Sequence, residues 1–159
     1  AERKYLEAHR TTAALLALTP TSPDSIFGHA QSTFYVGQSA ILRGDRQTAL
    51  QHWNAYRNLA GRLAKVEPNS VRSQMELGYS EGNLCDLYSR DGGDLNVALR
   101  HCMAAIYHEK KALALEPANR KMKQDLANRY GWAANVKLRL AFIFVMRQFA
   151  CDKDLRAFL

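Results

Sequence analysis

Five histidines give the chain imidazoles that could bind a metal ion or transfer a proton. His101 and His108 are seven residues apart, about two helical turns, so they could share one face of a helix. A protein metal site needs further ligands at close spacing, as in HExxH or paired cysteines, and the sequence has neither pattern. His52 and His101 also occupy equivalent positions in the repeat described below. We therefore expect structural histidines, no metal site and no cofactor.

Motifs for catalysis are missing from the sequence, which contains no GxSxG, GxxxxGK[ST] or GxGxxG. Its paired glycines lie in the Asp-Gly-Gly-Asp segment 91–94, where flanking carboxylates would repel a phosphate, so we interpret this segment as a turn. Acidic residues such as Glu76 and Glu81 are interpreted as helix-surface charge. Because no nucleophile, base and oxyanion site can be assembled, we do not expect an enzyme.

The charge balance is basic, with 22 Lys and Arg against 15 Asp and Glu and a net charge of +7. The densest basic groups lie at 110–111 and 120–123, and no long block of like charge occurs. A nucleic-acid-binding protein usually concentrates its basic residues on one stripe. The distribution favours a solvated basic face, and binding to nucleic acid or to an anionic surface is kept as the alternative function.

The three cysteines show no CxxC spacing, and their odd number argues against a disulfide framework. Cys85 and Cys102 lie in apolar helical patterns, so we expect free thiols in the core and a reducing, cytoplasmic compartment. The apolar run 140–146 is far shorter than the ~20 residues that span a bilayer, and no signal peptide is visible. The chain begins with Ala1 inside an expected helix, which suggests a piece of a longer protein.

A repeat of about 48 residues organises the sequence. Pro20, Pro68 and Pro117 end similar segments and are 48 and 49 residues apart. Each repeat has the pattern of two helices, and no stretch alternates like a strand. With 159 residues, 47% hydrophobic and 23% charged, the chain has the length of one domain, and its composition argues against a disordered tail, a fibre or a disulfide miniprotein. We expect an all-α domain with helices at 1–18, 24–43, 46–66, 70–90, 95–115 and from 119 onward.

Turn residues and apolar stripes support these helices. Asp45 and Asp94 can cap the helices that follow them, and Gly44 and Gly93 can relieve the turns before them. One apolar stripe runs along the third helix at steps of three and four: Ala49, Trp53, Tyr56, Ala60 and Leu63. The expected organisation is the second helix of a partial repeat at 1–22, repeats at 23–69 and 70–118, and a partial repeat with a capping helix at 119–159.

The repeated residues resemble the tetratricopeptide repeat family. The resemblance is carried in one copy by Gly37, Gly44, Asp45, Ala49, Trp53 and Pro68, and in the next by Cys85, Tyr88, Gly93, Asp94, Ala98, Cys102, Ala105 and Pro117. The period is longer than the usual 34 because both helices are longer, as in the variety found in bacterial signalling and regulatory proteins. The resemblance implies a right-handed superhelix of antiparallel helix pairs. Tyr56 stands where the family prefers alanine, and the pattern breaks down near residue 138.

This resemblance implies a non-catalytic protein-interaction scaffold, in which the first helix of each pair lines a concave groove that binds a peptide or partner helix. Gly82 and Gly131 would leave room there for a ligand backbone. The residues expected to line the groove are Gln31, Phe34, Gln38, Tyr79, Asp86, Arg90, Asn128, Asn135 and Arg139. They do not match the clamp by which some members of the family bind a C-terminal carboxylate.

The apolar C-terminal segment allows two interpretations. We expect residues 119–150 to form a long helix whose apolar side chains pack back on the stack as a cap. The side chains concerned are Leu140, Phe142, Phe144, Val145 and Phe149. The alternative is a self-association surface formed by Phe142, Phe144 and Phe149.

Overall fold

The computed structural model describes residues 2–90 and 92–151, and this part of the chain is all-α, with six helices and no strand. The helices are α1 (Glu2–Leu18), α2 (Pro23–Leu42), α3 (Arg46–Val66), α4 (Val71–Ser89), α5 (Leu95–Leu115) and α6 (Arg120–Cys151). Every helix end that the sequence predicted lies within one residue of the observed end. The prediction of an all-α chain is confirmed.

The predicted helix caps are present. The Asp45 carboxylate accepts a hydrogen bond from the Thr48 backbone N–H at 3.0 Å, and Asp94 caps α5 in the same way. Gly44 has the positive φ (78°) that its turn needs, but in the second turn Gly92 (φ 73°) takes this conformation instead of Gly93. Gly93 serves another purpose, because a Cβ there would lie 2.1 Å from the Tyr88 carbonyl oxygen.

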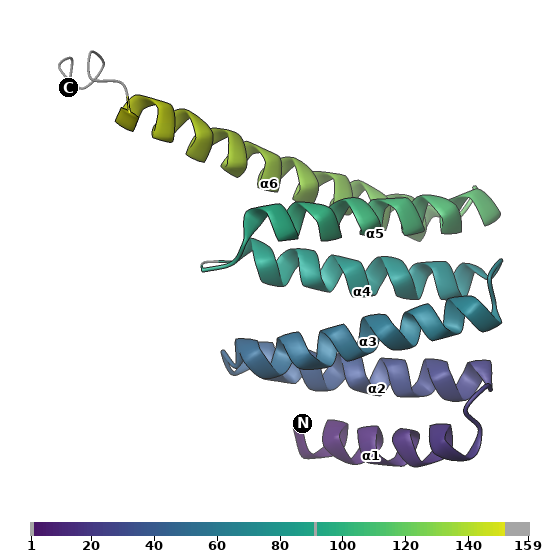
Figure 1. Cartoon of the computed structure of the whole chain (residues 1–159). Helices are drawn as coiled ribbons and strands as arrows, with labels where there is room; N and C mark the ends of the chain where they lie inside the picture. The colour runs from purple at the N-terminus through teal and green to yellow at the C-terminus, as the bar shows by residue number, and fades with distance from the viewer. Residues whose placement is uncertain (1, 91, 152–159) are drawn as a thin grey trace.

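Consecutive helices are antiparallel and pack against one another in chain order, as Figure 1 shows from α1 to α6. Side chains also join helices that are two apart in the sequence. Arg72 of α4 forms an ion pair with Asp24 of α2 at 2.8 Å, and Tyr79 of α4 donates a hydrogen bond to Asp125 of α6 at 2.9 Å. The even-numbered helices α2, α4 and α6 therefore share one side of the molecule.

Two equivalent positions hold the helix pairs together in different ways. In the α2–α3 pair the buried Trp53 indole fills the space beside Gly37, where a Cβ would lie 2.5 Å from the indole Cδ1. The corresponding residues of the α4–α5 pair, Cys85 and Cys102, form a disulfide with the Cα atoms 5.0 Å apart. The expectation of free thiols at Cys85 and Cys102 is therefore wrong, because antiparallel packing brings them opposite one another. The predicted reducing compartment loses the support that it took from those thiols.

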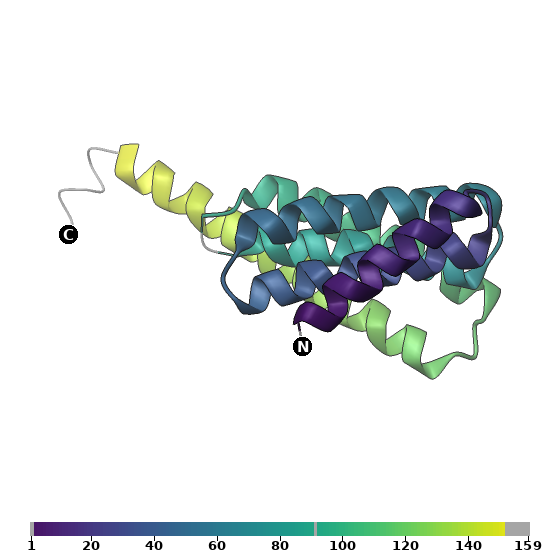
Figure 2. The same cartoon turned by 90° about the horizontal axis from the view of Figure 1, so that it is seen from below.

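The expected C-terminal cap is also wrong for most of its residues. Leu140 packs against the core between α4, α5 and α6, but Phe142 and Phe144 are 63% and 64% exposed, and Val145 and Phe149 are exposed as well. α6 has 32 residues whereas α2 to α5 have 19 to 21, so its last part extends beyond the helices on which it would have to pack (Figure 1). Figure 2 shows the same extension from below. In the described residues, no helix has both the length and the apolar character that crossing a membrane requires.

Candidate binding pocket

A pocket of about 350 Å³ opens between α2, α3 and α4. Two of its sides are formed by α2 and α4. Each helix presents three side chains at steps of three and four, so that each trio lies on one helix face. Tyr56 of α3 lies below them in the core. The lining residues are Phe27, Gln31, Phe34, Tyr56, Glu76, Tyr79 and Asn83.

Glu76 is the central polar group of this pocket and is only 5% exposed. Its Oε2 accepts one hydrogen bond from the Tyr56 hydroxyl and another from the Gln31 amide, each at 2.7 Å. Burial raises the pKa of Glu76, and the two hydrogen bonds act against that rise. Burial and the nearby Glu76 raise the pKa of Tyr56 well above its usual value, so Tyr56 remains a donor. The interpretation of Glu76 as helix-surface charge is wrong.

Cationic side chains surround the pocket, and each is neutralised by an acidic partner. Arg72, which pairs with Asp24, also contacts Glu67 at 2.7 Å and lies 5.2 Å from the centre of the Phe27 ring. Lys121 lies 5.5 Å from the centre of the Tyr79 ring and forms an ion pair with Asp125. These contacts fix the aromatic rings that line the pocket.

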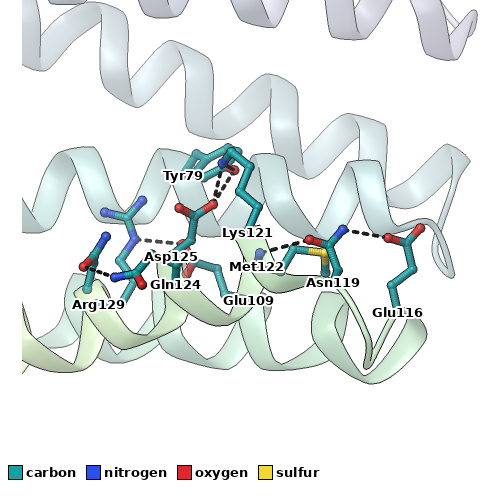
Figure 3. A network of polar contacts seen from close by, with 10 residues as sticks. Tyr79, Glu109, Glu116, Asn119, Lys121, Met122, Gln124, Asp125 and Arg129 are labelled. Carbon is teal, nitrogen blue, oxygen red and sulfur yellow. Dashed lines mark hydrogen bonds and ion pairs between the residues drawn. The ribbon is translucent and has the colours of Figure 1, made fainter.

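Tyr79 links the pocket to a polar network between α4 and α6 (Figure 3). Its hydroxyl donates to Asp125 and accepts a hydrogen bond from the Lys121 ammonium at 3.1 Å, while Lys121 and Asp125 pair at 2.7 Å. The pKa of Tyr79 is raised, first by burial. The pKa of Lys121 is raised by its hydrogen bonds to Asp125 and Tyr79. The network therefore holds Tyr79 as a neutral phenol with a fixed orientation.

A buried ion pair adjoins this network, between Arg129 of α6 and Glu109 of α5, with Nε and Oε1 2.7 Å apart. Glu109 is fully buried, and burial raises its pKa while Arg129 lowers it. A Cβ on Gly82 of α4 would lie 2.4 Å from the Arg129 Cζ. The space at Gly82, which we expected to admit a ligand backbone, is therefore filled by the protein's own guanidinium.

The structure brings three of the nine predicted groove residues together in the pocket, namely Gln31, Phe34 and Tyr79. Asp86 and Asn135 lie together in a smaller hollow of about 110 Å³ between α4 and α6. The nine residues were predicted to line one groove, and the structure places these five in two separate hollows.

The other four predicted residues lie outside both hollows. Arg90 pairs with Asp86 at 2.7 Å, and Arg139 of α6 donates a hydrogen bond to the Ser89 carbonyl. Asn128 is exposed and accepts a hydrogen bond from Gln124, and Gln38 is half-buried in α2.

Sequence reasoning missed Phe27, Tyr56, Glu76 and Asn83 as pocket residues. Phe27 and Glu76 precede Gln31 and Tyr79 by four and three residues, so the same helix faces, extended by one turn, would have included them. No comparable signal existed for Tyr56, which carries the pattern of a core residue and reaches the pocket only with its hydroxyl.

The histidines lie outside the pocket. His9, His29 and His52, from α1, α2 and α3, form a cluster in which the His9 ring centroid lies 4.7 Å from that of His29 and 5.5 Å from that of His52. His101 contacts Glu81 at 2.5 Å, and His108 lies 3.0 Å from Gln74. Among the residues that the structure describes, no group of three or more His, Cys, Asp or Glu could hold a metal ion.

A scan against protein-family models finds no match to this chain, and a search of curated proteins finds none either.

Proposed function

We propose that this chain is a non-catalytic protein-interaction module that binds a peptide or a partner helix along the side built from α2, α4 and α6. The proposal includes the arrangement of its helix pairs as a right-handed, tetratricopeptide-like superhelix whose concave face is that side. A surface formed in advance binds with little loss of conformational entropy.

Contacts between alternate helices support the stacked arrangement. Asp24 and Arg72 are 48 residues apart, and the hydrogen-bonded residues Tyr79 and Asp125 are 46 apart. These separations are close to the sequence period of 48 to 49 residues. In a stack of similar helix pairs, residues one repeat apart lie side by side, which is the pattern that these contacts follow.

The pocket between α2 and α4 is the observation that carries the binding proposal. It lies where the first helices of two successive pairs meet, and it contains Gln31, Phe34 and Tyr79, which were predicted as groove residues from the family resemblance and their repeat positions. Its amide, aromatic and carboxylate groups can bind the main chain and side chains of a peptide.

Selection of a random peptide library displayed on phage against the full chain tests this proposal. For enriched peptides, calorimetric titration should show Tyr79→Ala weakening binding by about tenfold or more, as expected for an aromatic contact residue at a binding site. Arg90→Ala should also weaken the binding of peptides that reach the end of α4. Tyr107→Ala is the matched control, because Tyr107 is an exposed tyrosine of α5.

Circular dichroism must show unchanged helical content for each variant. Failure to enrich any peptide would contradict the proposal, and binding that survives every substitution in the pocket would place the site elsewhere. If the chain instead bound DNA or RNA, with affinity falling linearly in log salt, the alternative function would replace it.

A further inference from the structure

We propose that the pocket around Glu76 receives one cationic side chain, lysine or arginine, of the bound protein. This inference rests on the proposed function and names the group that the partner must carry. It follows from the charge, the aromatic lining and the size of the pocket.

Glu76 is a buried carboxylate that is not paired with a cation, although the nearby Arg72 guanidinium helps to lower the pKa that burial raises. Among the described residues, no Lys, Arg or His nitrogen forms an ion pair with it, although Arg72, Lys121 and Arg129 lie around the same pocket. Each of those cations is held by another acid. A buried carboxylate without a counter-charge is costly, so a cation from outside would gain from pairing with it.

The geometry of the carboxylate leaves one oxygen for that cation. Both hydrogen bonds, from Tyr56 and Gln31, go to Oε2, and Oε1 accepts none from the described residues. The donors also fix the carboxylate plane, so that Oε1 is presented in a constant direction. A lysine ammonium or an arginine guanidinium supplies the donors that this oxygen lacks.

Aromatic rings form the rest of the lining. Phe27, Phe34 and Tyr79 line the pocket, and the negative face of such rings attracts a cation. The aliphatic stem of lysine or arginine can pack against the same rings. An anionic side chain would be repelled by the Glu76 carboxylate, and an uncharged side chain would leave that carboxylate unpaired. The lining therefore selects a cation with an apolar stem.

Two further features fit a single side chain on a peptide. The volume of about 350 Å³ is near the lower limit of the ~300–1,000 Å³ of ligand pockets, which suits one side chain. The Asn83 Nδ2 is buried and has no hydrogen-bond partner in the described structure. Asn83 lines the pocket, and a carbonyl oxygen of the bound peptide would supply the acceptor that this amide lacks.

Capped amino acids test the inference without knowledge of the partner. N-acetyl-lysine methylamide, N-acetyl-arginine methylamide and the uncharged analogue N-acetyl-norleucine methylamide are titrated into the full chain, and the ring signals of Phe34 and Tyr79 are followed by NMR. The lysine or arginine probe should bind at least about tenfold more tightly than norleucine, because close charge pairs contribute this much or more.

Glu76→Gln keeps the shape of the side chain and removes its charge. It should weaken binding of the preferred cationic probe by about tenfold and leave norleucine binding unchanged. Glu81→Gln is the matched control on α4, since Glu81 contacts Arg57 and His101 and does not line the pocket. If Glu76→Gln does not fold, the comparison of the three probes on the natural chain still decides.

Equal binding of lysine, arginine and norleucine, or cationic binding that Glu76→Gln leaves unchanged, would overturn the inference. Library peptides that lose affinity with Tyr79→Ala but not with Glu76→Gln would overturn the cation pocket and leave the proposed function intact. Failure of every library peptide, with cationic probes still bound at Glu76, would instead contradict the proposed function alone.

Discussion

Gly78 and Gly82 of α4 leave room for the buried ion pair between Glu109 and Arg129. A Cβ on Gly78 would lie 2.6 Å from the Glu109 Cγ, and a Cβ on Gly82 would lie 2.4 Å from the Arg129 Cζ. The space beside both glycines is therefore filled by other side chains. From the sequence alone, a residue without a side chain suggests that this space is open. The pair connects α5 to α6 directly over α4.

Gly82→Ala should lower the free energy of unfolding by about 1–3 kcal/mol, because the new methyl group must displace the Arg129 guanidinium from Glu109. Gly28→Ala is the matched control, since a Cβ there meets nothing within 4 Å. That substitution should stabilise α2 by about 0.5–1 kcal/mol. Urea unfolding of both variants measures the difference, and equal stability would show that Arg129 does not occupy this space.

Glu76 shows what could and could not be predicted at the level of single residues. The family resemblance and position in the repeat selected nine residues, of which Gln31, Phe34 and Tyr79 line one pocket. The burial of Glu76 was not predictable in the same way, because it depends on the Tyr56 hydroxyl from a third helix. A polar residue within a helix carries no sign in its own sequence of the donor that satisfies it.

The three N-terminal helices meet at the histidine cluster. Burial lowers the pKa of His9, His29 and His52, and the positive charge of His9 lowers the pKa of the other two further. The folded chain therefore favours neutral imidazoles, whereas the unfolded chain takes up protons near pH 6.5. The cluster contributes its full stability above that pH and loses it as the pH falls through the lowered pKa values.

Acidification from about pH 7 to 5 should therefore lower the unfolding free energy of the natural chain more than it lowers that of the His9→Gln variant. Urea unfolding of both chains at each pH provides the measurement. The comparison with the variant is needed because Glu76 and Glu109 have raised pKa values, and their protonation in the folded state acts in the opposite direction. Identical pH profiles for the two chains would show that the cluster is not formed.

The disulfide between Cys85 and Cys102 joins α4 to α5 across 17 residues of chain. A crosslink of this length restricts the unfolded chain and typically stabilises a fold by about 2–4 kcal/mol. Adding a reducing agent should therefore lower the unfolding free energy of the natural chain but not of Cys85→Ala/Cys102→Ala. With the bond formed, one of the three cysteines should react as a free thiol in the unfolded, unreduced chain. Three reactive thiols would contradict the bond.

The end of α6 differs from its prediction for a reason of length. The apolar composition of residues 140–149 indicated burial, but burial needs a partner helix, and α6 extends past the ends of the shorter helices (Figure 1). Composition shows that a surface is apolar and does not show what covers it. The helix itself, whose start and continuous pattern depend on local residues, was predicted correctly.

Phe142→Ser and Phe144→Ser should each change the unfolding free energy by less than about 0.5 kcal/mol, since both rings are mostly exposed. Trp53→Ala, which removes a buried ring, should cost about 3–5 kcal/mol and serves as the contrasting variant. A loss of several kcal/mol at Phe142 or Phe144 would restore the interpretation of this segment as a cap. Thermal and urea unfolding at low protein concentration provide the measurement.

At the scale of the whole molecule, the order of the helices was the most predictable feature. Prolines and Gly-Asp turns mark every joint, and the short joints require antiparallel neighbours. Contacts join α2 to α4 and α4 to α6, whereas the superhelical arrangement implied by the family resemblance stays a prediction. The pocket itself was not predictable, because its lining combines side chains from three helices, including Tyr56 of α3.

NMR of a complex between the full chain and a peptide enriched from the random library would locate the binding surface. We expect intermolecular contacts from the peptide to Phe34 and Tyr79, with further contacts along α4 and α6. Contacts confined to the exposed faces of α3 and α5, or to residues 142–149, would contradict it.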